Sequence, residues 1–330
     1  MSVVAKKTMI EAIREALAEE MRRDERVIVL GEDVGVGGGV FGATQGLYSE
    51  FGALRVLDTP LAESSIVGVA IGAAFNDMRP IAEIQFADFI FPAMNQIVSE
   101  AARIRYRSNG DFGCPIVIRA PYGGGVHGAL YHSQSVEGLF HHVPGLKIVA
   151  PATPYDAKGL LKAAIRDPDP VLFFEHKRTY RLIRGEVPEE EYALPIGRAA
   201  VKRPGADISV ISYGLLLHTV LEAAEALADE GIDVEVVDLM SIKPLDVTTI
   251  LDSVRKTSRA LVVHEDNLTG GVGAEVAALI AADAFEWLDA PVRRLCGPDA
   301  PAMGFAPTLE RAFVPDVARV RRAIADLAAY

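Results

Sequence analysis

The sequence predicts an α/β protein with two domains, each built around a parallel sheet. Short apolar runs typical of strands alternate with helical patterns along the 330 residues. Near residues 185–206 this alternation gives way to polar, proline-bearing sequence without periodicity. Since this length is sufficient for two domains, we expect a first domain over residues 1–190, a linker over 191–205 and a second domain over 206–330.

The first domain begins with an amphipathic helix over residues 8–21. Thr8 and Glu11 form a capping box, and an apolar stripe follows at helical spacing. A second helix is predicted over 153–167, where Thr153 is the N-cap and Pro154 occupies the first helical position. A third is predicted over 91–107. The strands between them are expected at 26–30, 81–86, 115–120, 146–150 and 171–176.

The second domain repeats the alternation. Strands are expected at 207–214, 232–239 and 260–266, with helices at 221–230 and 272–284.

Composition excludes several classes of function. The net charge of -12 argues against nucleic acid or an anionic membrane as a partner and suits a basic protein. Cys114 and Cys296 are far apart and form no CxxC pattern, so neither a disulfide framework nor a zinc cluster is indicated. No run of 18 apolar residues and no signal-peptide core is present, and we expect a cytoplasmic protein.

Two glycine-rich segments allow two interpretations each. Residues 37–42, GGGVFG, satisfy G-x-G-x-x-G but do not open a helix at a strand end, so a surface loop competes with a nucleotide site. Residues 267–276, NLTGGVGAEV, are compatible with an anion site or a structural turn. Neither a P-loop nor a nucleophile elbow is present.

His132 follows the glycine-rich sequence PYGGGVHG, in which the backbone can approach a ligand closely. The alternative is that His132 is a loop residue without a functional role. The spacing of this and the neighbouring histidines does not favour zinc. Residues 166–170, RDPDP, form an oxygen-rich corner that suits a hard cation or a plain turn.

Glu63 opens a helix that is otherwise small and apolar. An acid in the first turn interacts favourably with the helix dipole, by about 0.3–1 kcal/mol. The dipole does not explain why Gly68, Val69 and Gly72 follow at helical spacing. These residues make a face on which another backbone or a partner helix can lie very close, and we expect the carboxyl group beside it to be desolvated with a raised proton affinity.

The pattern E-x4-G-Φ-x-x-G over residues 63–72 resembles the half-motif of thiamine-diphosphate enzymes. Ordered segments from GEDVG (31–35) through YHSQSVEGLF (131–140) to HEDNLTGGVGAEV (264–276) resemble the β subunit of the E1 component of 2-oxo acid dehydrogenases. This resemblance implies a thiamine-diphosphate pyrimidine-binding domain followed by a transketolase C-terminal-like domain.

The resemblance also implies roles for individual residues. Glu63 would face N1′ of the cofactor's aminopyrimidine and share a proton with it, while Leu61, Gln85 and Phe89 would line the same pocket. Phe89 stands where branched-chain enzymes often have Tyr, so the hydroxyl is missing. His132 would assist substrate binding and acyl transfer to the lipoyl group. A structural potassium site is implied at Ile116, Ala164, Ile165, Asp167 and Asp169.

The sequence lacks the G-D-G and Asn-Asn pattern that binds the diphosphate and its magnesium. The resemblance therefore implies half of a cofactor site, with Mg²⁺ held by an α subunit in an α2β2 assembly. The acidic second domain would dock the basic subunit-binding domain of the E2 acyltransferase, whose lipoyl domain accepts the acyl group. The 2-oxo acid stays open between branched-chain substrates and pyruvate. An acetoin dehydrogenase β subunit and a non-catalytic assembly subunit that recruits E2 are the alternatives.

Overall fold

The computed structural model describes residues 4–330, which divide into two compact units. The first unit contains the chain up to Tyr122 together with Phe140–Ile196, and the second contains Gly123–Leu139 together with Gly197–Tyr330. The sequence placed residues 123–139 within a first domain that ends at 190. The structure groups them with the second unit instead, because their backbone N–H groups donate to carboxylates of that unit.

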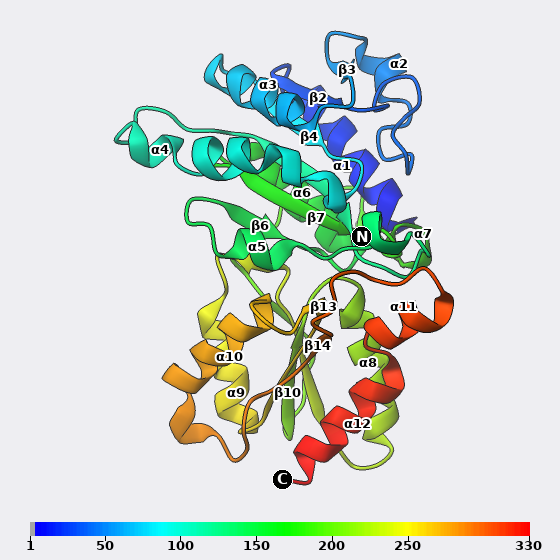
Figure 1. The fold of residues 1–330 in the computed structure, drawn as a ribbon, viewed down its shortest axis with the longest axis vertical. Coiled ribbons are helices and arrows are strands. Elements are labelled where there is room, and N and C mark those ends of the chain that lie inside the picture. The colour runs from blue at the N-terminus through cyan, green and yellow to red at the C-terminus, as the bar shows by residue number, and fades with distance from the viewer. Residues whose placement is uncertain (1–3) are drawn as a thin grey trace. The chain divides into compact units, whose positions relative to one another are not determined.

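A parallel sheet forms the centre of the first unit, with both faces covered by helices (Figure 1). Because β2 (Val27–Gly31), β5 (Val117–Tyr122) and β7 (Val171–His176) are buried along their whole length, they appear in the sequence as continuous apolar runs. The strands lie in the order β6 (Lys147–Val149), β7 (Val171–His176), β5 (Val117–Tyr122), β4 (Arg79–Glu83), β2 (Val27–Gly31) and β3 (Val56–Asp58).

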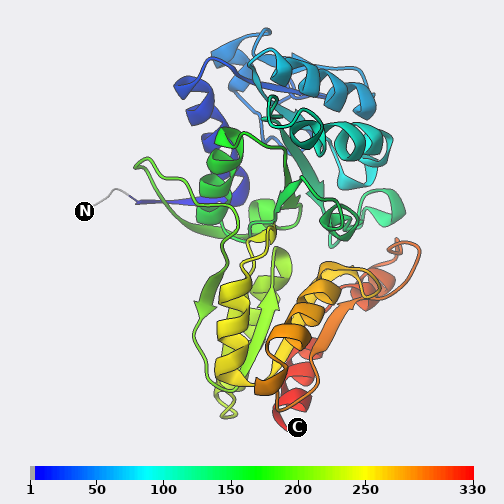
Figure 2. The same cartoon turned by 90° about the vertical axis from the view of Figure 1, so that its left-hand side faces the viewer.

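The two helices predicted with caps in the first unit are present. Thr8 and Glu11 make both bonds of the capping box at the start of α1 (Met9–Arg23). The Thr153 side chain accepts from Asp156 N at the start of α6 (Pro154–Arg166). These two helices lie side by side in Figure 2. Further helices there include α2 (Leu47–Phe51), α3 (Glu63–Phe75) and α7 (Thr179–Leu182), and α5 (Glu137–His141) has residues in both units.

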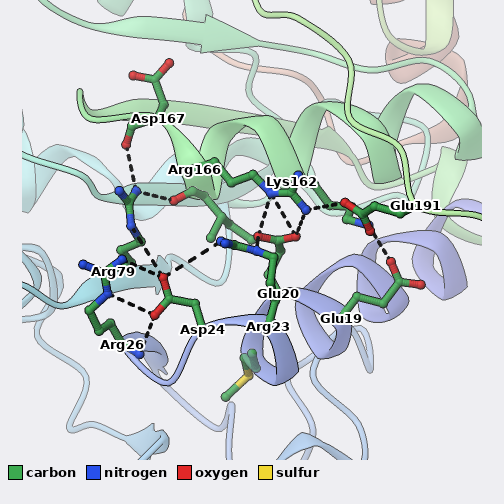
Figure 3. Close-up of polar contacts among 12 residues, drawn as sticks. Glu19, Glu20, Arg23, Asp24, Arg26, Arg79, Lys162, Arg166, Asp167 and Glu191 are labelled. Carbon is green, nitrogen blue, oxygen red and sulfur yellow. Dashed lines mark hydrogen bonds and ion pairs between the residues drawn. The ribbon is translucent and has the colours of Figure 1, made fainter.

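Charged side chains join α1 to α6 (Figure 3). Lys162, whose side chain is fully buried, lies 2.7 Å from Glu19 and also pairs with Glu191. The guanidinium of Arg166 bonds the buried Glu20. Since each buried charge has a partner of opposite sign, the interface tolerates them.

The predicted single helix over 91–107 is wrong. The segment forms a 3₁₀ turn (Phe91–Ala93), a π-helix (Asn95–Ala101) and a final α-helical turn, α4 (Ile104–Arg107). Ala102 N donates to Ile97 O at 3.0 Å, five residues back. At the end of this π-helix Gly145 crosses so closely that a Cβ there would lie 1.9 Å from Ala102 O. Apolar periodicity does not distinguish such a widened helix from an α-helix.

Two strands lie in or beside the region that the sequence presented as irregular. β8 (Arg184–Pro188) pairs antiparallel with β1 (Val4–Thr8), and β9 (Ala200–Arg203) joins the sheet of the second unit. The predicted linker over 191–205 therefore contains an edge strand.

The second unit is a five-stranded sheet with helices on both faces. In Figure 1, α9 (Val247–Thr257) and α10 (Val272–Asp283) cover one face, and α8 (Leu215–Ala228) and α12 (Val317–Ala328) cover the other. The strand order is β14 (Arg293–Gly297), β13 (Ala260–Asn267), β10 (Ile208–Ser212), β11 (Val234–Asp238) and β9, of which β9 alone in this sheet is antiparallel. The helices are α8 (Leu215–Ala228), α9 (Val247–Thr257), α10 (Val272–Asp283), α11 (Pro307–Phe313) and α12 (Val317–Ala328). Across residues 4–330, no helix is both long and apolar enough to cross a bilayer.

Candidate functional site

Glu63 lies beyond the carboxyl ends of the parallel strands in the first unit. It is the first residue of α3, which begins shortly after β3 ends at Asp58, and its side chain is half-buried. In open α/β sheets this edge is where ligands bind. The preceding N-cap residue, Ala62, contributes no side-chain bond. The carboxyl group of Glu63 therefore stands at the helix N-terminus, next to the edge where a ligand is expected.

Three acids gather at this edge. Glu32 and Asp33 directly follow β2, and burial raises the pKa of Glu32, with the charges of Asp33 and Glu63 adding to the effect. The Gln85 side chain donates to Asp33 Oδ2 at 3.2 Å. The structure thus brings Gln85 to the same edge as Glu63. A ligand that donates hydrogen bonds would relieve this concentration of negative charge.

The small-residue face of α3, made of Gly68, Val69 and Gly72, is open at Val69 and Gly72. Val69 is 59% exposed, and no described atom outside the backbone of the helix itself lies within 4 Å of a Cβ placed at Gly72. At Gly68 such a Cβ would lie 3.8 Å from Gln96 Cγ. The sequence predicted that this face is packed. Within residues 4–330 most of it is uncovered, which leaves it available to the partner helix that the sequence also allowed.

An aromatic wall borders the same edge. Phe89 and Phe86 meet edge to face at 5.6 Å between ring centroids, and Phe86 meets Phe41 at 5.4 Å. Leu61 is 71% exposed just before α3. The edge thus offers flat apolar groups beside the three acids, a combination that suits an aromatic ring with polar substituents.

The GGGVFG loop over residues 37–42 is closed by its own backbone. Gly39 N donates to Asp33 O at 2.8 Å, Gly42 N donates to Gly39 O at 3.0 Å, and Arg14 holds Gly42 O. No helix starts at this loop, because α2 begins only at Leu47. It therefore lacks the strand–turn–helix geometry of a dinucleotide site.

His132 belongs to the second unit. It follows a short turn (Ala129–Tyr131) and is half-buried, with its backbone N–H donating to Ala129 O at 3.3 Å. His127 and Ala129 both have positive φ, near 57° and 55°. Such conformations are costly for residues other than glycine, which indicates that the surrounding structure holds the loop in this shape.

Basic side chains surround the Asp167–Asp169 corner, and Figure 3 shows one of them, Arg79, beside Asp167. Arg79 Nη1 donates to Ile165 O at 2.9 Å and to Asp167 O at 3.3 Å. Lys147 Nζ lies 2.7 Å from Asp167 Oδ1, and Arg105 pairs with Asp169. A cationic side chain of this chain thus already contacts two of the predicted potassium ligands.

The other two predicted ligands make backbone bonds near the same corner. Ala164 O accepts from Asp167 N at 3.2 Å, and Ile116 O accepts from Val171 N at 3.0 Å. Each carbonyl oxygen has a second lone pair, so these bonds leave room for a further cation. No cluster of three or more His, Cys, Asp or Glu side chains suited to a metal occurs in residues 4–330.

Comparison with known families resolves the class of protein. The transketolase pyrimidine-binding domain family matches residues 5–183, and the transketolase C-terminal domain family matches residues 197–320. The chain is 63% identical to the 2-oxoisovalerate dehydrogenase subunit beta of Bacillus subtilis, over 97% of this chain and 98% of that protein. This chain is an E1β subunit of the 2-oxo acid dehydrogenase family.

Other relatives support the same assignment. The E1β chain is 53% identical to the pyruvate dehydrogenase E1 component subunit beta of Bacillus subtilis, over 90% of this chain and 91% of that one. In fold it resembles a split-gene transketolase (TM-score 0.76, 22% identity, 98% of both chains). It also resembles a transketolase from Leishmania mexicana (TM-score 0.71, 14% identity, 100% of this chain and 46% of that one).

Sequence reasoning missed a buried charged network in the E1β chain. Arg119 on β5 is fully buried, bonds Glu175 on β7 at 2.6 Å and pairs with Glu83 on β4. Tyr180 also donates to Glu175. Burial raises the pKa of Glu83. The sequence signal that could have revealed the network is an isolated charge in each of three predicted apolar strands. The network lies next to the sheet edge that carries Gln85.

The segment 267–276 is a structural turn. The His264 ring accepts from Gly273 N at 3.0 Å at the start of α10. A Cβ at Gly271 would lie 2.3 Å from Asn267 O. The Gly273 N–H at this helix start is therefore already bonded within the chain, which favours the structural turn.

Proposed function

We propose that this E1β chain, paired with an α subunit, takes part in thiamine-diphosphate-dependent oxidative decarboxylation of a branched-chain 2-oxo acid. The acyl group would pass to the lipoyl group of an E2 acyltransferase. The observation that carries the proposal is the position of Glu63 at the start of α3, beside the carboxyl ends of the parallel strands. The choice of substrate rests on the higher identity to the 2-oxoisovalerate enzyme than to the pyruvate enzyme.

The residues at this edge fit the aminopyrimidine half of the cofactor. When bound, thiamine diphosphate supplies an electron sink for the loss of carbon dioxide from a 2-oxo acid. Glu63 would hold and share a proton at N1′ of the aminopyrimidine. Phe89, backed by Phe86, provides an apolar wall for the flat ring, and Leu61 and Gln85 complete the lining.

The α subunit would complete the site. The open small-residue face of α3 and the missing diphosphate motif both support a partner that covers Glu63 and holds Mg²⁺. We assign the pair to an α2β2 assembly. A net charge of -12 supports docking of a basic subunit-binding domain of E2.

His132 would contact the substrate or the lipoyl group. The residue is half-buried on a loop rather than enclosed in the core, which suits a group that meets a large incoming domain.

The test of this function is Glu63→Gln in the co-expressed α–β complex. Glutamine fills the same space but cannot share the proton, so we expect assembly to be retained and decarboxylation to fall by at least about a hundredfold. Glu222→Gln, an exposed carboxyl group on α8, is the matched control and should remain fully active. Near-normal turnover of Glu63→Gln would instead favour the non-catalytic assembly subunit.

The substrate is tested with the same complex. Rates with 3-methyl-2-oxobutanoate, pyruvate and acetoin should rank the branched-chain acid first. A preference for pyruvate or acetoin would overturn the substrate proposal and leave the E1β assignment intact.

We also propose a structural potassium ion at the corner formed by Ile116, Ala164, Ile165, Asp167 and Asp169. The support is the set of backbone oxygens there, each with a lone pair beyond its existing bond. At equal ionic strength, the melting temperature of the complex should be higher in potassium chloride than in sodium or choline chloride, by a few degrees. Equal melting temperatures would contradict the potassium proposal, and the Arg79 guanidinium would then be the cationic group that these oxygens bind.

A further inference from the structure

Buried carboxyl groups attach the loop Gly123–Leu139, which carries His132, to the rest of the second unit. Gly124 N donates to Glu265 Oε1 at 2.5 Å, and Gly138 N donates to Asp266 Oδ2 at 3.1 Å. These bonds fix the two ends of the loop. Glu265 and Asp266 are only 3% and 8% exposed, so the bonds are made largely out of water and are charge-assisted.

A third carboxyl group holds the middle of the loop. Glu310 on α11 is buried, and its Oε1 accepts from Gly125 N at 2.7 Å and from His127 N at 3.1 Å. Its other oxygen lies 2.6 Å from His127 Nδ1. His132 therefore follows a turn whose backbone is clamped on both sides.

Glycines at both ends of the loop let the backbone approach its acceptors closely. A Cβ at Gly138 would lie 2.6 Å from Asp266 Oδ2 and 3.2 Å from Gly270 O, so a larger residue there would push the backbone N–H away from its carboxylate. A Cβ at Gly124 would lie 2.3 Å from Met303 Sδ, so a side chain there would displace the end of Met303.

Glu137, next to Gly138, is wholly buried and faces the same acids. The Tyr213 hydroxyl, at the end of β10, donates to Glu137 Oε1 at 2.8 Å. Burial raises the pKa of Glu137 well above its ordinary value, and the charges of Asp266 and Glu265 raise it further. Burial also raises the pKa of Asp266, to about 6, although N–H groups of Asn267 and Gly138 favour its ionised form.

Two histidines also border this cluster. His264, on the same strand as Asp266, is buried, which lowers its pKa to about 4 and leaves it neutral near pH 7. His127 lies against Glu310. Because two backbone N–H groups favour the ionised form of Asp266, we expect Glu137 to be the protonated carboxyl group of the two.

We propose that Glu137, Glu265, Asp266 and Glu310 are positioning residues for His132, which hold its loop in place, and that Glu137 does so in its protonated form. The consequence for catalysis rests on the role proposed above for His132. Because the folded state favours protonated Glu137, its stabilising contribution is present at low pH and is lost as pH rises through its folded pKa. Deprotonation would place a second charge beside Asp266 and release the loop.

Hydrogen exchange of peptides within 123–139, measured on the assembled α–β complex from about pH 6 to about pH 10, tests the proposal without an activity assay. After correction for intrinsic exchange, wild-type protection should fall by at least about tenfold at the alkaline end. Glu137→Gln, which stays neutral, should retain protection throughout. Glu225→Gln, an exposed carboxyl group on α8, should behave as wild type.

Tyr213→Phe provides a second, independent variant. The hydroxyl bond favours ionised Glu137, so its removal should shift the loss of protection to higher pH. The proposal is overturned if Glu137→Gln follows the wild-type pH dependence, or if it exposes the loop already near neutral pH.

Steady-state rates of acyl transfer and of decarboxylation then separate the positioning role of Glu137 from the proposed function of the complex. At alkaline pH, Glu137→Gln should retain acyl transfer to a lipoyl domain better than wild type, while decarboxylation with an artificial electron acceptor changes equally in both. If neither enzyme decarboxylates any 2-oxo acid, the proposed function fails, whereas the exchange result still decides the role of the carboxyl groups.

Discussion

His264 and Asp266 show how two residues of one strand respond to pH in opposite directions. Burial lowers the pKa of His264 from 6.5 to about 4, whereas burial raises that of Asp266 from 3.8 to about 6. The contribution of His264 is present above its ordinary pKa and is lost as pH falls towards 4. That of Asp266 is present at low pH and is lost as pH rises towards 6. The two effects largely offset one another over this range.

His264→Gln should remove one of these two opposing effects and so make the stability of the complex depend visibly on pH. Glutamine keeps an acceptor for Gly273 N but cannot gain a proton, so the variant should become more stable relative to wild type as pH falls from about 6.5 to about 4. The relative gain should be about 3 kcal/mol, from the size of the pKa shift. Thermal melting of both complexes across this range measures it, with the exposed His142→Gln as control. Parallel melting curves would contradict the argument.

At the scale of elements, apolar runs predicted strands and N-cap residues predicted helix starts correctly, because both signals are local in the sequence. The capping box of α1 and the Thr153 cap of α6 depend on residues three apart, and the structure confirms both. The buried strands appeared in the sequence because a parallel sheet covered on both faces requires continuous apolar runs.

The network of Glu83, Arg119 and Glu175 could not be predicted in the same way. Each residue stands alone in an apolar strand, and only the order β4-β5-β7 makes them neighbours. The prediction of a single helix over 91–107 was wrong for a related reason. Its periodicity is helical, but the crossing of Gly145 beside Ala102 coincides with the widened turn and comes from a distant part of the chain.

At the scale of the whole molecule, the open face of α3 indicates that the chain works with a partner. Gly68, Val69 and Gly72 are small or apolar residues on an exposed helix surface, beside the carboxyl group proposed to be catalytic. A face this poor in side chains allows a second backbone to approach closely, which would desolvate Glu63.

Gly72→Glu tests that surface. No described atom outside the backbone of the helix itself lies within 4 Å of a Cβ at this position, so the chain should fold normally, and helix propensity should rise slightly. We expect the variant to fail to assemble with α, because a charged side chain would be buried against the partner. Light scattering after co-expression measures assembly, and Ala278→Glu on the exposed side of α10 is the control. A normal α–β complex from Gly72→Glu would show that the face lies outside the interface.

The sequence by itself determined the two α/β domains, the family and the candidate acid Glu63, because these follow from local periodicity and ordered motifs. Tertiary structure alone decided that the loop of His132 belongs with the second unit and that Arg79 contacts the predicted potassium ligands. It also decided that buried carboxyl groups hold that loop. These features depend on which distant segments become neighbours and on how strongly burial disfavours a charged side chain. The spacing of residues along the chain determines neither.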